Sequence, residues 1–179
     1  MRIISGKLKG KTIVAPKHLP VRPTTDFAKT GLFNILNNQY QFETLSILDL
    51  FTGTGAISYE FASRNCENIL AIDMHAACVK FVNSVFKKWQ CIGCEAQQSD
   101  AFLFLKKCNE SFDIIFADPP YDLPQIENLV TLILDRNLLK PRGVFILEHE
   151  HNRPIQTKIL PDDVRNYGNV SFSFFKSTT

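Results

Sequence analysis

The sequence predicts an α/β fold in which a parallel β-sheet is covered by helices on both faces. From residue 46 onward, short apolar runs typical of buried strands alternate with segments that repeat apolar residues at helical spacing. Glycine-containing or acidic turns follow several of the strand runs. The chain has 179 residues, 45% of them hydrophobic, and shows no repeats, low-complexity tracts or linkers. It therefore fits one domain with a single packed core.

The N-terminal part has a different pattern. Residues 1–15 contain two short β-rich runs around a glycine-punctuated connection, which predicts a β-hairpin. Three prolines keep the next stretch extended, and the sequence Thr24-Thr25-Asp26 supplies capping residues for a helix over 26–38. Gly31 lies inside this helix and should weaken it by about 1 kcal/mol relative to alanine. It could mark the close approach of another backbone or of a ligand, but we interpret it as a tolerated surface glycine.

The remaining elements follow in regular order. Strands are expected at residues 47–51, 68–73, 94–98, 112–117 and 143–147, with two closing strands at 155–160 and 169–175. The helices between them are expected at 56–64, 75–89, 100–107 and 124–137.

Composition excludes several classes of protein. No apolar run approaches the roughly 18 to 20 residues that a membrane span needs. The N-terminus lacks the apolar stretch and small-residue cleavage site of a signal peptide, so we expect a cytoplasmic protein with no membrane partner. Five cysteines within apolar segments indicate reduced, mostly buried thiols. Cys91 and Cys94 form a single CxxC pair without a second ligand pair, so no metal is expected.

The charges are unevenly distributed along the chain. The net charge is +2, but residues 1–29 carry seven Lys and Arg residues against one acid, Asp26. A basic arm on a mildly acidic body is typical of an enzyme that binds nucleic acid. A solvated basic hairpin would show the same composition, so charge alone leaves both interpretations open.

A glycine turn follows the first strand of the predicted sheet. Gly53 and Gly55 allow the backbone to turn tightly and to approach a ligand closely. The dinucleotide fingerprint G-x-G-x-x-G would need a third glycine where this chain has Ser58, and there is no phosphate loop. The turn therefore suits a nucleoside ligand that carries no pyrophosphate.

Two acids follow the next two strands. Asp73 ends the second strand, where a carboxylate can accept hydrogen bonds from both ribose hydroxyls of a nucleoside. Asp100 follows the third strand, where its carboxylate could receive an adenine amino group while the Ala101 N–H reaches a ring nitrogen. Either acid could instead cap the helix that follows it.

The sequence Asp118-Pro119-Pro120-Tyr121 follows the fourth strand. The two prolines stop the strand and hold an extended turn at the sheet edge where ligands bind in open α/β folds. The Asp118 carboxylate and the Pro119 carbonyl can accept the hydrogens of an exocyclic amine, while the Tyr121 ring offers a face on which a base can stack. A base in structured nucleic acid must first be turned out of its stack, which costs a few kcal/mol.

Taken in order, these residues resemble a known family. Asp49-x-x-x-Gly53-x-Gly55, Asp73, Asp100 and the Asp-Pro-Pro-Tyr turn are similar to class I S-adenosylmethionine-dependent methyltransferases that act on amino groups. Arg2-Ile3-Ile4-x-Gly6-Lys7-x-x-Gly10, residues 22–26 (Arg-Pro-Thr-Thr-Asp) and Leu32-Phe33-Asn34-x-Leu36 resemble the RsmD family more specifically. That family methylates the N2 amine of a guanine in the RNA of the bacterial small ribosomal subunit. The resemblance covers residues 1 to about 148, and the chain departs from the family at Phe27 and Thr30, where Arg and Glu are usual.

The resemblance implies a Rossmann-like, seven-stranded methyltransferase sheet with an N-terminal β-hairpin extension. Residues 1–25 would be a basic, RNA-contacting hairpin and linker, and residues 26–179 the methyltransferase domain. It implies S-adenosylmethionine as cofactor and ribosomal RNA, within a small-subunit particle, as partner of a monomeric enzyme. The implied cofactor residues are Asp49, Gly53, Gly55, Asp73, Met74, Asp100, Ala101 and Thr24. The implied catalytic residues are Asp118, Pro119, Pro120 and Tyr121, and the implied RNA contacts are Arg2, Lys7, Lys9, Lys11 and Arg22.

Three other functions remain open from the residues. A DNA adenine-N6 or a protein glutamine methyltransferase could use a similar turn, although the glutamine enzymes usually have Asn where this chain has Asp118. A non-catalytic RNA-binding domain would explain the basic arm but would not need the cofactor residues. A nicotinamide oxidoreductase is disfavoured by the missing third glycine.

Overall fold

One mixed sheet of seven strands organises the molecule. The computed structural model describes residues 1–16, 19, 25–120, 123, 126–153, 155 and 157–177. The strands are β1 (Ser46–Leu50), β2 (Asn68–Asp73), β3 (Cys94–Gln98), β4 (Phe112–Ala117), β5 (Leu139–Glu150), β6 (Asp163–Tyr167) and β7 (Val170–Lys176). Their order across the sheet is β3-β2-β1-β4-β5-β7-β6. The first five pair in parallel, and β7 runs antiparallel to both β5 and β6.

Helices cover both faces of this sheet. They are α1 (Asp26–Asn37), α2 (Ala56–Ser63), α3 (Ala76–Lys88), α4 (Ala101–Lys107) and α5 (Ile126–Asp135), with a short 3-10 helix η1 (Phe42–Thr44). Side chains of α1, α2 and α3 share one buried cluster with alternate strand residues such as Ile47. Those of α4 and α5 share a second cluster with the intervening residues such as Leu48. The predicted α/β fold with helices on both faces is confirmed.

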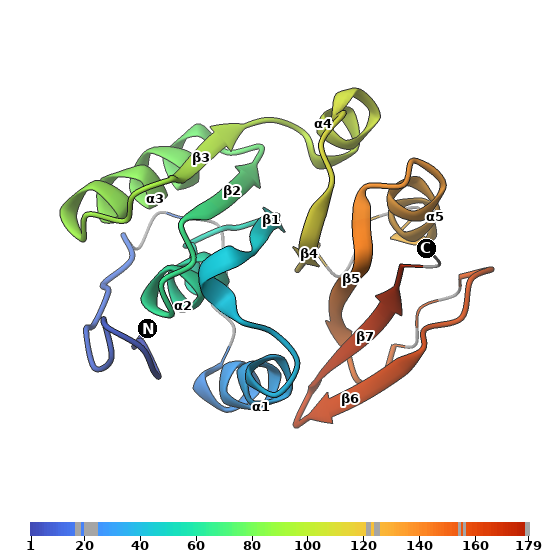
Figure 1. The fold of residues 1–179 in the computed structure, drawn as a ribbon, viewed down its shortest axis with the longest axis horizontal. Coiled ribbons are helices and arrows are strands. Elements are labelled where there is room, and N and C mark those ends of the chain that lie inside the picture. Colours follow the sequence, from blue (N-terminus) through green and yellow to red (C-terminus); the bar gives the residue numbers. More distant parts are fainter. Residues whose placement is uncertain are drawn as a thin grey trace.

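The N-terminal residues pair as an antiparallel hairpin and pack against the body of the domain. Ile3 N–H donates to the Lys11 carbonyl (3.0 Å), and Ile13 N–H donates to the Met1 carbonyl (2.9 Å). Arg2 and Thr12 form an isolated antiparallel β-bridge, and residues 1–16 contain no regular strand. The two predicted runs therefore pair as a hairpin, but they are not regular strands. Ile3, among other hairpin side chains, is buried in the α1–α2–α3 cluster. Figure 1 shows this segment in dark blue beside α2 and α3, with β6 and β7 at the opposite end of the sheet.

The closing strands differ from the prediction. The expected strand at 155–160 is wrong, because β6 lies at Asp163–Tyr167. It is an edge strand whose residues are exposed or half-buried, so it lacks the apolar alternation on which the prediction depended. β5 is longer than the expected 143–147 and contains an irregularity opposite Phe112 and Ile114. Among the described helices, none is long and apolar enough to cross a membrane.

Helix α1 meets β6 at Gly31. A Cβ atom on Gly31 would lie 2.0 Å from Cε1 of the Tyr167 ring, so no larger residue fits without movement of the ring. The interpretation of Gly31 as a tolerated surface glycine is therefore wrong, and close packing explains it. The helix begins as predicted, since the Thr25 hydroxyl accepts a hydrogen bond from Ala28 N–H (3.2 Å).

Candidate active site

Three acids meet at the carboxyl edge of the parallel strands. Asp49 lies in β1, Asp73 ends β2, and Asp118 follows β4. Leu50 is paired with Ile72 on one side and with Ala117 on the other, so the three strands end at the same level. This edge is where ligands bind in open α/β sheets, and it collects the residues singled out from the sequence.

The glycine turn between β1 and α2 is shaped for close backbone approach. Gly55 begins α2 in a left-handed conformation (φ 81°), and a Cβ there would lie 2.6 Å from the ring of Tyr59. A side chain at this position would therefore be strained by both backbone and packing. Thr52 N–H donates to the Ile72 carbonyl (3.0 Å), which ties the turn to β2. Phe51 also has a positive φ of 58°, which the sequence pattern did not indicate.

Asp49 is held by hydroxyl groups instead of cations. Its side chain is only 2% exposed. Its carboxylate accepts hydrogen bonds from the hydroxyls of Thr52 (2.7 Å) and Ser58, two residues that sequence reasoning did not assign to the site. Burial raises the pKa of Asp49 to about 6, against the lowering effect of these hydroxyls. Within the described part of the chain, no Lys or Arg forms an ion pair with it.

Asp73 connects the glycine turn to the start of α3. One carboxylate oxygen accepts from Gly53 N–H (2.9 Å), and the other accepts from His75 N–H (2.8 Å). Asp73 therefore contacts the N–H of His75, the residue that precedes the first turn of α3, but α3 has no side-chain capping hydrogen bond. Met74 follows with an exposed side chain, and its carbonyl accepts from the Gln98 side chain (3.1 Å). The ribose role of Asp73 stays a prediction.

Asp100 caps helix α4. One of its carboxylate oxygens accepts from Leu103 N–H (2.8 Å), as expected of an N-cap. Asp100 is exposed and Ala101 is buried at the same edge of the sheet. Their contact with an adenine ring stays a prediction.

Asp118 lies next to Asp49 across two neighbouring strands. Its N–H is 3.5 Å from the Leu50 carbonyl in β1. Removal from water raises the pKa of Asp118 to about 7, and the Asp49 carboxylate adds to this rise. Pro119 is buried and Pro120 is exposed. Tyr121, together with Arg22 and Thr24, lies outside the described residues.

The predicted RNA contacts lie along the hairpin. Arg2, Lys7, Lys9 and Lys11 are all exposed. The hairpin follows α2 along its length: the Met1 sulfur lies 3.9 Å from the Thr54 hydroxyl, and Lys7 N–H donates to the Ser63 carbonyl (2.7 Å). Arg2 therefore lies toward the acidic edge, near Asp26 (3.7 Å), while Lys7 lies at the far end of α2.

A buried charge network holds the hairpin in place, and sequence reasoning missed it. Glu60 and Lys29 are fully buried, with Lys29 Nζ 3.3 Å from Glu60 and 2.7 Å from the Arg2 carbonyl. Arg64 donates to the other Glu60 oxygen (2.7 Å) and lies over the Phe33 ring. Glu60 also accepts from Ile4 N–H (2.9 Å), so one carboxylate joins α1, α2 and the hairpin.

The two departures noted in α1 are both accommodated by local contacts. The Phe27 ring meets the Tyr167 ring edge-on at 5.8 Å, and the Thr30 hydroxyl donates to the Asp26 carbonyl (2.7 Å).

The described cysteines are all free thiols. No group of His, Cys, Asp and Glu in the described ranges could hold a metal ion.

Comparison with known proteins identifies the family of this chain. A family model described as conserved hypothetical protein 95 matches residues 1–176. A curated relative, the ribosomal RNA small subunit methyltransferase D of Buchnera aphidicola subsp. Baizongia pistaciae, is 30% identical over 151 residues, which are 84% of this chain and 76% of the relative. The chain belongs to this family, the RsmD family.

Solved structures give the same result for the fold of this RsmD family member. A putative methyltransferase from Escherichia coli, yhhF, superposes with a TM-score of 0.84 at 25% identity, over 99% of this chain and 97% of the other. An RNA methyltransferase from Salinibacter ruber, in complex with S-adenosylhomocysteine, superposes with a TM-score of 0.65 at 18% identity, over 88% of this chain and 95% of the other. The predicted class I methyltransferase fold is confirmed, and S-adenosylmethionine as the cofactor is in line with these neighbours.

Proposed function

We propose that this protein transfers a methyl group from S-adenosylmethionine to the exocyclic N2 amine of a guanine in small-subunit ribosomal RNA. The observation that carries the proposal is the position of Asp118 beside Asp49, at the edge of the sheet where the glycine turn lies. The relative named as a small-subunit ribosomal RNA methyltransferase supports the choice of substrate.

The residues at the edge fit the methyl donor. S-adenosylmethionine supplies a methyl group on a positively charged sulfur. Two acids with raised pKa values and no cationic partner among the described residues favour a positively charged ligand. The turn at Gly53 and Gly55 admits the donor's methionine part, Asp73 accepts from the ribose, and Asp100 with Ala101 receives the adenine. Met74 and Thr24 complete the donor site.

Asp118 and the prolines hold the amine. The carboxylate and the Pro119 carbonyl accept the amine hydrogens and turn the nitrogen lone pair toward the methyl group, while Tyr121 stacks on the base. Most of the acceleration comes from this positioning. The nitrogen loses a proton on methylation, and a carboxylate with a pKa of about 7 is suited to accept it near neutral pH.

The basic hairpin provides the grip on RNA. Residues 1–25 form an RNA-contacting extension of a methyltransferase domain made by residues 26–179. Arg2, Lys7, Lys9 and Lys11 bind phosphates, and Arg22 is a further RNA-contacting residue. A rigid hairpin loses little conformational entropy on binding, and its attachment through Glu60 provides that rigidity.

Other amino methyltransferases are the second candidate, because an adenine-N6 enzyme can use the same Asp-Pro-Pro-Tyr turn. The two candidates differ in the product, N2-methylguanine or N6-methyladenine. Calorimetry with S-adenosylhomocysteine and with NAD distinguishes a methyltransferase from a non-catalytic RNA-binding domain and from a nicotinamide enzyme. Failure to bind the former would refute the methyltransferase function.

The decisive experiment follows labelled methyl groups into ribosomal RNA from a strain that lacks this protein. Naked RNA, isolated small subunits and whole ribosomes are compared, which also identifies the assembly stage of the substrate. We expect label in N2-methylguanine with small subunits. Asp118→Ala should abolish transfer and leave cofactor binding largely intact; equal loss of both would show that Asp118 belongs to the donor site instead.

A further inference from the structure

The outer face of α3 carries a row of lysines beside the hairpin. Lys80, Lys87 and Lys88 are exposed, and α3 contains no Asp or Glu. Lys80 and Lys87 are seven residues apart, which places them on the same side of the helix. The opposite side is apolar and buried against the sheet. The helix therefore adds three positive charges to one face without a compensating acid of its own.

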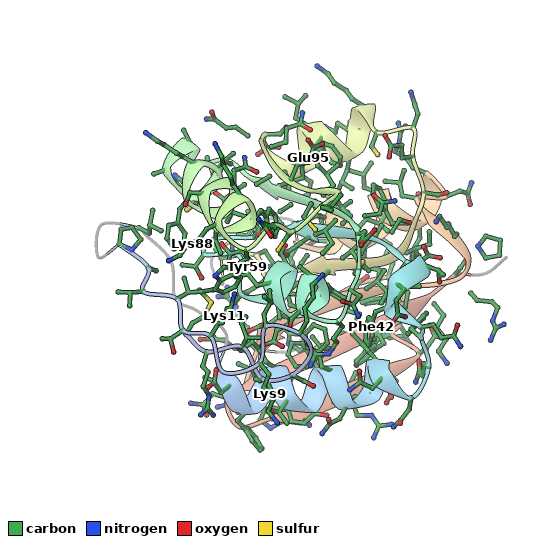
Figure 2. All side chains as sticks on the ribbon, turned by 60° about the vertical axis from the view of Figure 1, so that its left-hand side comes forward. Lys9, Lys11, Phe42, Tyr59, Lys88 and Glu95 are labelled. Atoms are coloured by element: carbon green, nitrogen blue, oxygen red, sulfur yellow. The ribbon has the colours of Figure 1, made fainter. Side chains whose placement is uncertain are left out.

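Contacts make this face continuous with the hairpin. Lys11 Nζ lies 5.4 Å from the centre of the Trp89 ring, directly after the end of α3. Lys7 and Lys11 both lie close enough to Cys91 to lower the pKa of its thiol, against the effect of burial. Figure 2 labels Lys9, Lys11 and Lys88 on this side of the molecule, where Lys11 and Lys88 belong to neighbouring segments.

The surface made by these two segments is rigid. The hairpin is fixed to α2 by Leu8 N–H on the Ser63 hydroxyl (3.0 Å) and by the Glu60 network. Helix α3 is fixed to β3 by the Asn83 side chain, which exchanges two hydrogen bonds with the Ala96 backbone (2.8 Å each). The backbone positions that carry the lysines of both segments are therefore fixed relative to each other.

We propose that the outer face of α3 and the N-terminal hairpin form one phosphate-binding surface, which holds RNA that flanks the methylated nucleotide. The inference rests on the proposed function, since it assumes an RNA substrate. The partner is identified by charge complementarity: a lysine-rich surface without acids on the helix matches the regularly spaced charges of a phosphate backbone.

The surface is distant from the chemistry. Helix α3 starts just after Asp73, at the acidic edge, and its 13 residues span roughly 20 Å at 1.5 Å per residue. Lys87 and Lys88 at its far end are thus separated from that edge by more than twice the Debye length of about 8 Å at physiological salt. They act on the affinity for RNA, and their direct electrostatic effect on methyl transfer is screened.

A second explanation exists for Lys87 and Lys88, since lysines in the last turn of a helix also stabilise its dipole. Helix α4 provides a matched control, because it ends with the exposed pair Lys106 and Lys107 and also contains no acid. Its C-terminus lies on the other face of the sheet, in the α4–α5 layer. Neutralising either pair removes the same interaction with a helix dipole, but only one pair belongs to the proposed surface.

The test measures the affinity of the full-length protein for a small-subunit rRNA fragment over a series of salt concentrations. We expect Lys87→Gln/Lys88→Gln to reduce the slope of log affinity against log salt by about 2, one unit per phosphate contact. Binding at physiological salt should weaken roughly tenfold, with the change in KM for RNA and not in kcat. Lys106→Gln/Lys107→Gln should leave the slope unchanged.

The outcomes separate this proposal from the proposed function. Equal slopes for wild type and Lys87→Gln/Lys88→Gln, or equal reductions in both double variants, would overturn the α3 surface even if methylation of rRNA is normal. Neutralising Lys7, Lys9 and Lys11 should also reduce the salt slope, because the hairpin belongs to the same surface. An unchanged slope would show that the hairpin does not bind RNA, and would overturn the joint surface. A wild-type protein that methylates no rRNA would instead refute the proposed function. Calorimetry with S-adenosylhomocysteine checks that both double variants remain folded.

Discussion

Replacing Glu60 by alanine should destabilise the domain and release the N-terminal hairpin. Glu60 is fully buried and accepts hydrogen bonds from Ile4 N–H (2.9 Å), Lys29 Nζ (3.3 Å) and Arg64 Nη1 (2.7 Å). Alanine removes the carboxylate that joins all three. It removes the Glu60 carboxylate from two buried cations, Lys29 and Arg64, and leaves the Ile4 N–H without its acceptor.

The remaining contacts set the size of the effect. Removing one partner of a buried ion pair usually costs about 3 to 5 kcal/mol. Lys29 keeps the Arg2 carbonyl (2.7 Å) and the partly exposed Asp26 (3.3 Å). Arg64 keeps the backbone carbonyl of residue 60 (2.7 Å) and the face of Phe33 (4.2 Å). We therefore expect a loss near the lower limit, about 3 kcal/mol, which is a large part of the roughly 5 to 15 kcal/mol typical of a domain.

Two measurements check this expectation. Urea unfolding should show a lower midpoint, and a smaller slope to the extent that the released hairpin already exposes its surface in the native state. Brief trypsin treatment under native conditions should cut at the hairpin lysines faster than in the wild type, because the hairpin loses the Ile4–Glu60 part of its attachment to α2. Glu95→Ala is the control, since Glu95 is exposed on β3, and Figure 2 labels it away from the hairpin. A loss below about 1 kcal/mol, or unchanged cleavage, would refute the reasoning.

Two further predictions concern packing and pH. Gly31→Ala should destabilise by about 1 to 3 kcal/mol despite the better helix propensity of alanine, because its Cβ would overlap the Tyr167 ring. Tyr167→Ala in the same chain should turn this loss into a gain; if the loss persists, the ring is not its cause. The pKa of Asp118 is raised to about 7 in the folded protein, so between about pH 4 and pH 7 the folded state binds more protons than the unfolded state. The free energy of unfolding should therefore fall as the pH rises through this range, and should fall less in Asp118→Asn, as urea titrations at pH 5 and pH 8 would show.

The acidic edge could be predicted from the sequence because its signals are local. Asp73 and Asp118 each follow a continuous apolar run, and parallel strands bring their carboxyl ends together whatever else the chain does. The hydroxyl contacts of Asp49 could not be predicted, since the positions of Thr52 and Ser58 depend on the left-handed turn at Gly55.

The missed features depend on contacts between distant parts of the chain. Glu60 and Arg64 have the spacing of an ordinary surface pair on a helix, but the hairpin and α1 both pack against them and bury them. The need for glycine at position 31 comes from the Tyr167 ring, which belongs to the last hairpin of the sheet and is distant in the sequence. The position of β6 could not be predicted for a related reason. This edge strand is stabilised by pairing with β7, and its own residues show no apolar alternation.

Helix α2 links the hairpin that we propose to bind RNA with the edge that we propose to bind the methyl donor. Its first residues close the glycine turn at Gly55, Glu60 at its middle holds the hairpin, and Ser63 at its end binds the hairpin turn through Lys7 N–H. The eight residues of α2 thus fix the hairpin relative to the edge that carries Asp49. RNA phosphates seated on the hairpin would then lie at a set distance from Asp118. We therefore expect the choice of nucleotide to depend on where the RNA backbone meets the hairpin as much as on the residues that contact the base.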